Sequence, residues 1–338
     1  MSKVKLENRK IELQVNLKGG FYIDLRLKGN PLNPLNWRNN GNDGLSFEGH
    51  FLCCDRWGPP SDAEAANGFT HHGEASSETW KLLPETEPKD GLTHCSMHCT
   101  LPMGGLQLTR DIKLSPEQPV FFVTEKIKNL NKQGRMYNIV QHVSIAPPFL
   151  DRSTLFDTNA EKGFEDKEDG SLNQEEPVFY WPNAVKGDQT VNLRQFNNVW
   201  PRVSSFSFSE NDEYAWVTAC NPGKNLMLGY VWKTADYPWI NFWRSMEDDV
   251  PMAFGMEFGT TGLHEPMPIV AKKGKIFGRN IYDFLDSQEV VRKSFTAFLA
   301  KIPEDYQGVS EIEIGASAMI IKEKNNISRD INYRLMNF

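Results

Sequence analysis

Residues 11–27, IELQVNLKGGFYIDLRL, decide the fold. Apolar and polar residues alternate in this stretch on both sides of the glycine pair Gly19–Gly20. Alternation with a period of two is typical of a strand with one buried face, and paired glycines permit a tight turn. The stretch therefore predicts a β-hairpin with strands over residues 11–17 and 21–27.

The same signal recurs along the chain, and Gly, Pro, Asn or Asp separates most of the strand-like runs. These runs are 93–100, 106–114, 120–129, 136–145, 203–209, 214–219, 226–232, 239–244, 253–259, 294–300 and 311–321. Helical periodicity is scarce, and residues 286–293 are at best a short helix. The pattern predicts an all-β fold, a large antiparallel β-supersandwich with few short helices, as a single domain over residues 1–338.

Composition narrows the classes of function. The 338 residues carry a formal net charge of −7 and contain no basic run interleaved with aromatic residues, so nucleic acid and anionic membranes are disfavoured as partners. No apolar run reaches the roughly 18 residues of a membrane span. The polar N-terminus lacks a signal-peptide core, and five cysteines form an odd, sparse set. Both features predict reduced thiols and a cytoplasmic location.

Two titratable residues stand inside apolar, strand-like runs far apart in the chain. His142 lies in YNIVQHVS (137–144), and Glu257 lies in AFGMEFG (253–259). Burying an ionisable group costs free energy unless the group is paired or used, so each residue is either a satisfied core residue or a functional one. Because Pro147–Pro148 ends the first run and a glycine-containing loop follows the second, both residues are expected near strand ends. There they would supply one pocket with a proton donor and a proton acceptor.

The segment 50–80 is the least strand-like part of the front half. This Gly/Pro-rich stretch carries polar groups and flat rings, namely Arg56, Trp57, His71, His72, Glu74 and Trp80. A neutral sugar needs hydroxyl partners and an aromatic platform, and these residues could supply both. An ordinary polar loop is the competing interpretation.

The histidines of the front half raise a zinc site as a further alternative. Adjacent residues in an extended segment point to opposite sides, so at most one of His71 and His72 is expected to bind an ion. His94 and His98 share one face of an expected strand but lie about 13 Å apart, which is too far for one ion. We therefore predict no metal ligands.

Tryptophans are numerous, with nine in the chain, and Trp232, Trp239 and Trp243 crowd one region. They are either core and rim packing or a surface on which the apolar face of a sugar stacks.

Three landmarks, taken in order, resemble the aldose 1-epimerase (galactose mutarotase) superfamily over residues 10–320. They are THHG at 70–73, VQH at 140–142 followed by APPF at 146–149, and the late strand with Glu257. The chain is more similar to the uncharacterised mutarotase-like branch than to true galactose mutarotases. The resemblance implies the β-supersandwich of that family, a small carbohydrate as partner, and isomerisation of sugar anomers without a cofactor.

The resemblance also implies roles for single residues. His142 matches the general acid and Glu257 the general base, while Arg56 and His72 match substrate-positioning residues. The remaining candidate substrate contacts are Trp57, Glu74, Trp239 and, for a further polar ligand, Asp236 or Asn241. Two positions depart from the family pattern, because Glu74 stands where a glycine is usual and Gln141 precedes the acid where an asparagine is usual.

Interconversion of anomers opens a hemiacetal ring, with a base taking the proton of the anomeric hydroxyl while an acid protonates the ring oxygen. We expect Glu257 to raise the pKa of His142, and a six-membered ring to fit between the two side chains. Two alternatives stay open. One is a non-catalytic carbohydrate-binding or sugar-sensing module of the same fold, and the other is a relative of polysaccharide lyases or hydrolases.

Overall fold

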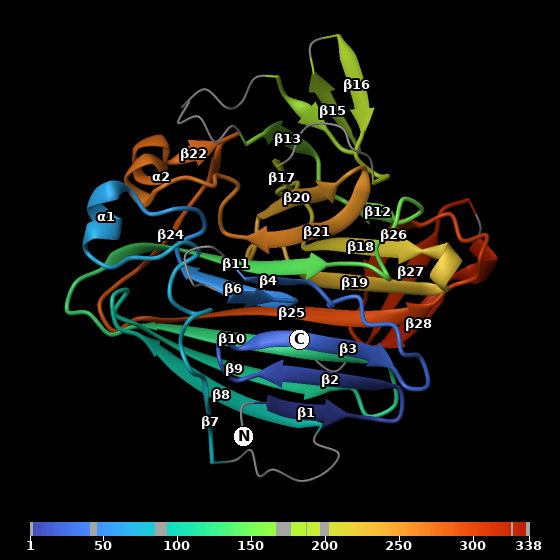
Figure 1. Cartoon of the computed structure of the whole chain (residues 1–338), viewed down its shortest axis with the longest axis horizontal. Helices are drawn as coiled ribbons and strands as arrows, with labels where there is room; N and C mark the ends of the chain where they lie inside the picture. Colours follow the sequence, from blue (N-terminus) through green and yellow to red (C-terminus); the bar gives the residue numbers. More distant parts are fainter. Residues whose placement is uncertain are drawn as a thin grey trace.

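The computed structural model describes residues 3–40, 46–84, 93–166, 177–186, 188–196, 203–325 and 327–335. Two large antiparallel sheets pack face to face (Figure 1). The 13-stranded sheet has the order β1 (Lys3–Glu7), β2 (Ile11–Asn16), β3 (Phe21–Leu27), β6 (His50–Asp55), β11 (Arg135–Ile145), β21 (Val250–Gly259), β20 (Trp239–Glu247), β17 (Val203–Ser207), β13 (Lys162–Glu165), β14 (Phe179–Tyr180), β15 (Asn183–Lys186) and β16 (Gln189–Asn192), and β24 (Asp283–Leu285) also pairs with β11. The 8-stranded sheet has the order β12 (Leu155–Thr158), β18 (Tyr214–Asn221), β19 (Leu226–Lys233), β25 (Val290–Lys301), β10 (Val120–Asn129), β9 (Leu106–Leu114), β8 (His94–Leu101) and β7 (Lys81–Leu82).

Small sheets and short helices complete the described residues. The small sheets are β4 (Arg38–Asn40) with β5 (Ser46–Glu48), β22 (Lys275–Ile276) with β23 (Arg279–Asn280), and β26 (Val309–Ile314) with β27 (Ala318–Glu323) and β28 (Ile331–Arg334). The helices are α1 (Asp62–Ala66), α2 (Met267–Lys273) and the 3₁₀ turns η1 (Pro222–Lys224) and η2 (Ile327–Arg329). No helix in the described ranges is long and apolar enough to cross a bilayer.

The N-terminal hairpin and the all-β class are confirmed. Residues of β2 and β3 pair antiparallel, and Gly19 and Gly20 adopt the positive φ angles of 83° and 64° that the turn between them requires. The burial pattern of β2 alternates as the sequence does. The expected antiparallel sandwich with few helices is therefore the observed architecture.

Residue parity decides which side chains enter the core between the two sheets. On β11, Ile139, Val143 and Ile145 belong to the main apolar cluster, and on β21 Met256 and Phe258 do so. Because successive side chains of a strand point to opposite faces, the even-numbered residues of β11 and the odd-numbered residues of β21 face away from the second sheet. The even-numbered residues of β11 and the odd-numbered residues of β21 therefore line the outer face of the larger sheet.

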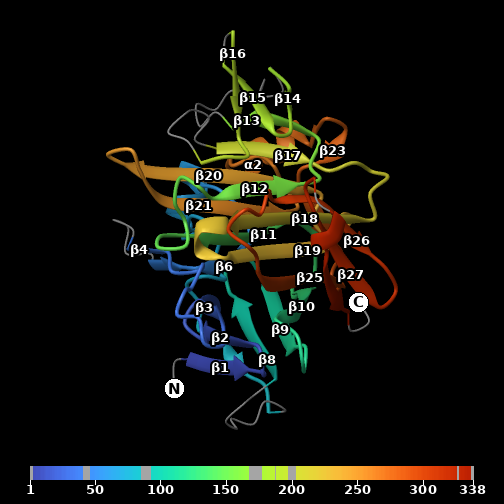
Figure 2. The same cartoon turned by 90° about the vertical axis from the view of Figure 1, so that its right-hand side faces the viewer.

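The C-terminal sheet β26–β28 covers part of the outer face of the smaller sheet (Figure 2). A second apolar cluster joins them and includes Val120, Trp216 and Phe298 from the smaller sheet and Ile312 and Met319 from the small one. This packing covers only part of the smaller sheet, because outward residues of β9 and β10, among them Asp111, Lys113 and Lys126, line an open hollow of about 580 Å³.

Two local expectations were wrong. Residues 286–293 form a turn followed by the start of β25, because Gln288 has a φ of 60° and the β-branched residues Val290 and Val291 pair with β10. Residues 311–321 contain two strands rather than one. The chain reverses at Gly315, whose N–H donates to the carbonyl of Ala318, so that β26 pairs with β27.

Candidate functional site

The centre of the candidate site is a cross-strand pair of side chains. His142 on β11 lies directly opposite Glu257 on β21 in the antiparallel register, and both side chains project from the outer face of the larger sheet. His142 Nε2 lies 3.1 Å from Glu257 Oε1. Two residues 115 positions apart (257 − 142) are thus in direct contact, as strand pairing brings directly opposed side chains together.

Neighbouring groups fix both members of the pair. Trp57 Nε1 donates a 2.8 Å hydrogen bond to Glu257 Oε2, and His142 Nδ1 lies 3.0 Å from Ser144 Oγ. Gly255 shares the face of Glu257, and a Cβ at Gly255 would lie 2.6 Å from Oε1 of that carboxyl. The absence of a side chain at Gly255 therefore makes room for the carboxyl group.

Burial sets the protonation of the pair. His142 is 6% exposed and Glu257 is 1% exposed. Burial raises the pKa of Glu257 to about 8, although the hydrogen bond from Trp57 opposes the rise. Burial also lowers the pKa of His142 well below its usual value, and the nearby His264 and His71 lower it further. Near neutral pH the pair therefore holds one titratable proton, on Glu257, beside a neutral imidazole.

Two expectations about this pair were wrong. Glu257 does not raise the pKa of His142, because desolvation of the imidazole is the largest influence on it. The 3.1 Å contact also leaves no room for a sugar ring between the two groups. A substrate would have to lie beside the pair rather than between its members.

Replacing Glu257 by glutamine should stabilise the fold at alkaline pH. Between pH 4.5 and about 8 the folded chain keeps a proton on Glu257 that the unfolded chain has released, so the free energy of unfolding falls as pH rises. Glutamine can keep the hydrogen bond from Trp57 and does not titrate. The gain over wild type should grow across this window to about 3–5 kcal/mol and stay constant above it. Urea unfolding at a series of pH values measures it, with the exposed Glu304→Gln as control. A gain that does not depend on pH would contradict the assigned protonation.

Aromatic rings surround the imidazole of His142. The ring of Phe51 stacks on it at 4.1 Å between centroids, and Trp37 and Trp243 lie at 6.3 Å each. Trp37 and Trp243 also line a groove of about 660 Å³, together with polar residues that include Asn36, Arg38 and Ser245. Neither His142 nor Glu257 lines this groove, but two of the rings that do line it neighbour His142, and such rings suit the apolar face of a sugar.

A turn over residues 70–73 carries two further histidines to the same place. His72 has a φ of 63° and Gly73 a φ of 74°, so the segment is not extended, and the rings of His71 and His72 lie on one side with centroids 3.9 Å apart. The ring of His72 meets that of His142 edge-on at 5.2 Å. The expectation that these neighbours point to opposite sides was wrong because it assumed an extended backbone.

Gly73→Ala should destabilise this turn. A Cβ at Gly73 would lie 2.0 Å from the carbonyl oxygen of Cys54, with which the turn forms a parallel bridge. We expect a loss on the order of 3 kcal/mol in the free energy of unfolding, measured in urea. Gly29→Ala is the matched control, because Gly29 has a φ of 79° and its Cβ would meet no described atom within 4 Å. That control should cost about 1 kcal/mol, and equal losses in the two variants would contradict the steric argument.

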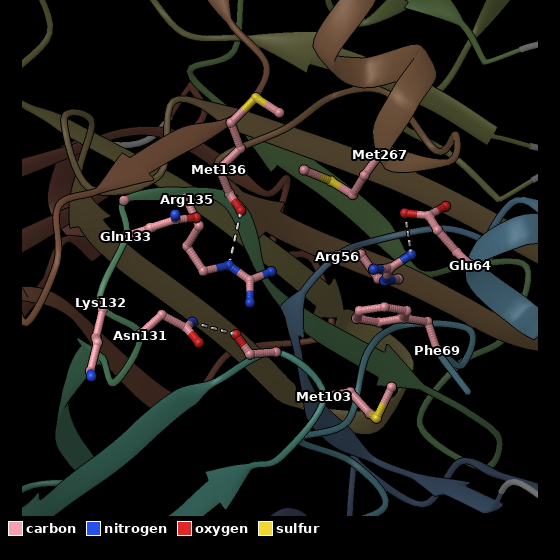
Figure 3. Close-up of a pocket in the computed structure, with 12 residues that line it drawn as sticks. Arg56, Glu64, Phe69, Met103, Asn131, Lys132, Gln133, Arg135, Met136 and Met267 are labelled. Atoms are coloured by element: carbon pink, nitrogen blue, oxygen red, sulfur yellow. Dashed lines mark hydrogen bonds and ion pairs between the residues drawn. The ribbon is translucent and has the colours of Figure 1, made fainter. Parts of the chain in front are cut away.

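The other candidate substrate residues lie in different places. Arg56 is buried, pairs with Asp55 and Glu64, and lines a separate cavity of about 530 Å³, across which Arg135 faces it (Figure 3). Glu74 accepts hydrogen bonds from the backbone N–H groups of Met103 and Gly104, at 3.0 and 2.7 Å. These contacts hold a neighbouring loop.

Asp236 and Trp239 also make structural contacts. The carboxylate of Asp236 accepts a hydrogen bond from the N–H of Ser294, which fastens the turn between β19 and β20 to β25. Trp239 is fully buried and donates to the carbonyl of Asn280. Asn241, the other candidate for a polar ligand, lies opposite Glu257 and donates to its carbonyl at 3.3 Å. Of the candidates, the structure thus gathers His142, Glu257, Trp57 and His72, with Asn241 beside them.

Sequence reasoning missed Trp37, Ser144 and His264. His264 belongs to the loop after β21, where its Nε2 lies 3.3 Å from Nε2 of His71 and its ring meets that of Trp57 at 4.7 Å. A polar residue two positions from His142 shares its strand face, so Ser144 had a signal in the alternation. Trp37 and His264 lie in segments without periodicity, and only the tertiary fold places them.

Comparison with known proteins supports the fold. No family model matches the sequence, and no curated protein does. Among solved structures, a galactose mutarotase related enzyme from Lactobacillus acidophilus is similar with a TM-score of 0.62 at 10% identity, over 92% of this chain and 100% of that one. A galactose mutarotase-like protein from Clostridium acetobutylicum gives 0.62 at 12% identity, over 89% and 95%.

The same fold also occurs inside a larger chain. A TPR-domain containing protein from Parabacteroides distasonis matches with a TM-score of 0.58 at 12% identity, over 93% of this chain and 49% of that one. The chain therefore has the galactose mutarotase-like β-sandwich fold, as the landmarks predicted. Identities this low establish the fold alone.

Proposed function

We propose that this protein interconverts the anomers of a small sugar by general acid–base catalysis at His142 and Glu257. The observation that carries the proposal is their 3.1 Å contact beside a groove walled by Trp37 and Trp243. The fold shared with galactose mutarotase-like proteins supports the same choice of chemistry.

The adjacency of the pair suits the reaction because the two oxygen atoms that exchange protons are bonded to the same carbon. One member of the pair takes the proton of the anomeric hydroxyl while the other gives a proton to the ring oxygen. The bond from the anomeric carbon to the ring oxygen breaks, and the carbonyl forms. The pair holds one proton before and after this step. With that proton on Glu257, the carboxyl gives a proton to the ring oxygen while the neutral His142 takes the proton of the anomeric hydroxyl. The two groups exchange roles when the ring closes, so that His142 is then the acid and Glu257 the base.

Substrate contacts follow from the same geometry. His72, beside His142, would bind a hydroxyl group, and the two tryptophans would stack on the ring of the sugar. Arg56, which lines the neighbouring cavity, would influence the bound sugar without touching it. We place the activity in the cytoplasm, which suits five buried cysteines that form no disulfide in the described residues.

Anomer exchange measured by NMR tests the proposal. We expect the protein to accelerate exchange between α and β signals of at least one aldose in a panel of neutral sugars. Line broadening or saturation transfer gives the rate, and boiled protein is the control. Absence of acceleration for every sugar that binds would remove the isomerase function.

A non-catalytic sugar-binding module is the second candidate. It is favoured by the near-complete burial of the pair, since a buried His–Glu contact can serve the fold alone. Calorimetric binding of a sugar without any acceleration of exchange would support this candidate over the first.

A further inference from the structure

Three histidines from two loops meet at the edge of the proton-transfer pair. His71, His72 and His264 each offer one ring nitrogen, and these atoms all lie within 4.8 Å of one another. The centroid of the His264 ring lies 5.3 Å from that of His71 and 5.6 Å from that of His72. The cluster is separate from the pair, since neither His142 nor Glu257 belongs to it.

The spacing matches a tetrahedral metal ion. A zinc ion binds histidine nitrogen at about 2.0–2.1 Å, so two ligands at tetrahedral angles lie about 3.3–3.4 Å apart. The Nε2 atoms of His71 and His264 are 3.3 Å apart already. A small change of side-chain torsion at His72 would bring the third nitrogen from within 4.8 Å to the same spacing. We propose that His71, His72 and His264 form a binding site for a divalent transition-metal ion, with Zn²⁺ as the best match.

The chemistry of the donors agrees with the spacing. His72 is 9% exposed, and its Nδ1 is buried with no hydrogen-bond partner among the described residues. An unpaired buried nitrogen costs free energy that a ligand would recover. Burial and the neighbouring imidazoles lower the pKa of His72, which favours the neutral form that metals bind.

The backbone holds the two loops in place for this role. The carbonyl of Gly58, a residue with a φ of 101°, accepts a hydrogen bond from the N–H of His72, and a Cβ at Gly58 would lie 2.9 Å from the backbone carbonyl carbon of His264. The N–H of His264 donates to Asp166 Oδ2 at 2.7 Å. A three-histidine site held on fixed loops leaves a fourth coordination position for water or a substrate oxygen.

The metal proposal goes beyond the proposed isomerase and can be tested without any sugar. After treatment with a chelator, the full chain is titrated with Zn²⁺ alone in a calorimeter. We expect one ion per chain, and at least a 10–100-fold weaker affinity in His71→Ala and in His264→Ala. His98→Ala is the matched control, because His98 lies on β8 outside the cluster, and it should keep the wild-type affinity.

Thermal unfolding gives a second readout. Zn²⁺ should raise the Tm of the wild type and of His98→Ala but not of the two cluster variants, because a ligand stabilises only the state that binds it. Failure of the wild type to bind Zn²⁺ would overturn the proposal, and so would wild-type affinity in both cluster variants. Either failure leaves anomer exchange, which the proposed function predicts separately, to its own test.

Discussion

His142→Ala is expected to slow anomer interconversion by about 10²–10⁴-fold while the protein still folds and binds sugar. The imidazole is the partner of Glu257 at 3.1 Å, and without it one of the two simultaneous proton transfers loses its group. His142 is near the outer surface of the larger sheet, with an exposed fraction of 6%, so alanine opens space toward the groove rather than in the core between the sheets. NMR exchange rates with the sugar that gives the fastest wild-type exchange measure the effect.

Glu257→Gln should slow anomer interconversion by a factor of the same order, for a different chemical reason. Glutamine can keep the hydrogen bond from Trp57 and fill the same space, but it can neither accept nor release a proton. The dissociation constant for sugar should change little in either variant while the exchange rate collapses. His98→Ala and Glu304→Gln, which replace the same residue types elsewhere, should keep the wild-type rate. Wild-type rates in both His142→Ala and Glu257→Gln would show that the pair serves only the fold.

The alternation of apolar and polar residues predicted most of the strands of the fold. The strands β2, β3, β9 and β10 lie where period-two patterns predicted them, since each has one buried face. The strand β11 also lies where it was predicted, although it is buried on both faces from Tyr137 to Ile145. The same parity explains why two adjacent residues of β11 have opposite surroundings. Gln141 points into the core between the sheets, where it bonds to Glu125 and His50, whereas His142 projects from the outer face. A titratable residue in an apolar strand was therefore a usable signal for the site.

The residues that sequence reasoning misplaced depend on backbone conformations or contacts with no local pattern. The positive φ of His72 turned an assumed extended segment into a turn and brought both histidines to one side. His264 reaches them from a loop that follows β21, almost two hundred residues further on (264 − 71 = 193). Arg56, next to Trp57, faces a different cavity, because adjacent side chains diverge even where the loop as a whole lies near the site.

A second large effect is expected at a buried ion pair on the opposite face of β11. Arg110 is fully buried, its Nε donates to Glu125 Oε1 at 2.8 Å, and its guanidinium lies over the rings of Tyr22 and Trp80. Alternation along 106–114 places Arg110 on the same face as the apolar Leu108 and Ile112. The charge therefore sits in the core and not on an exposed sheet face.

The ion pair joins the two sheets beneath the candidate site. Glu125 Oε2 accepts a 2.8 Å hydrogen bond from Gln141 Nε2, and the amide oxygen of Gln141 lies 2.9 Å from His50 Nε2. Arg110 and Glu125 belong to the smaller sheet, whereas Gln141 and His50 belong to the larger one. Loss of the guanidinium would thus leave a buried carboxylate without its cation in the middle of a polar network.

Arg110→Met should therefore lower the free energy of unfolding by about 3–5 kcal/mol, measured by urea unfolding. Arg26→Met is the matched control, because Arg26 pairs with Asp24 and Glu12 where its side chain is 31% exposed, and it should cost less than about 1 kcal/mol. Adding Glu125→Gln to Arg110→Met should restore much of the loss, since glutamine removes the unpaired charge and can still accept from Gln141. A loss in Arg110→Met no greater than in Arg26→Met would mean that the carboxyl takes up a proton at little cost. The polar network would then hold the sheets together through its neutral hydrogen bonds.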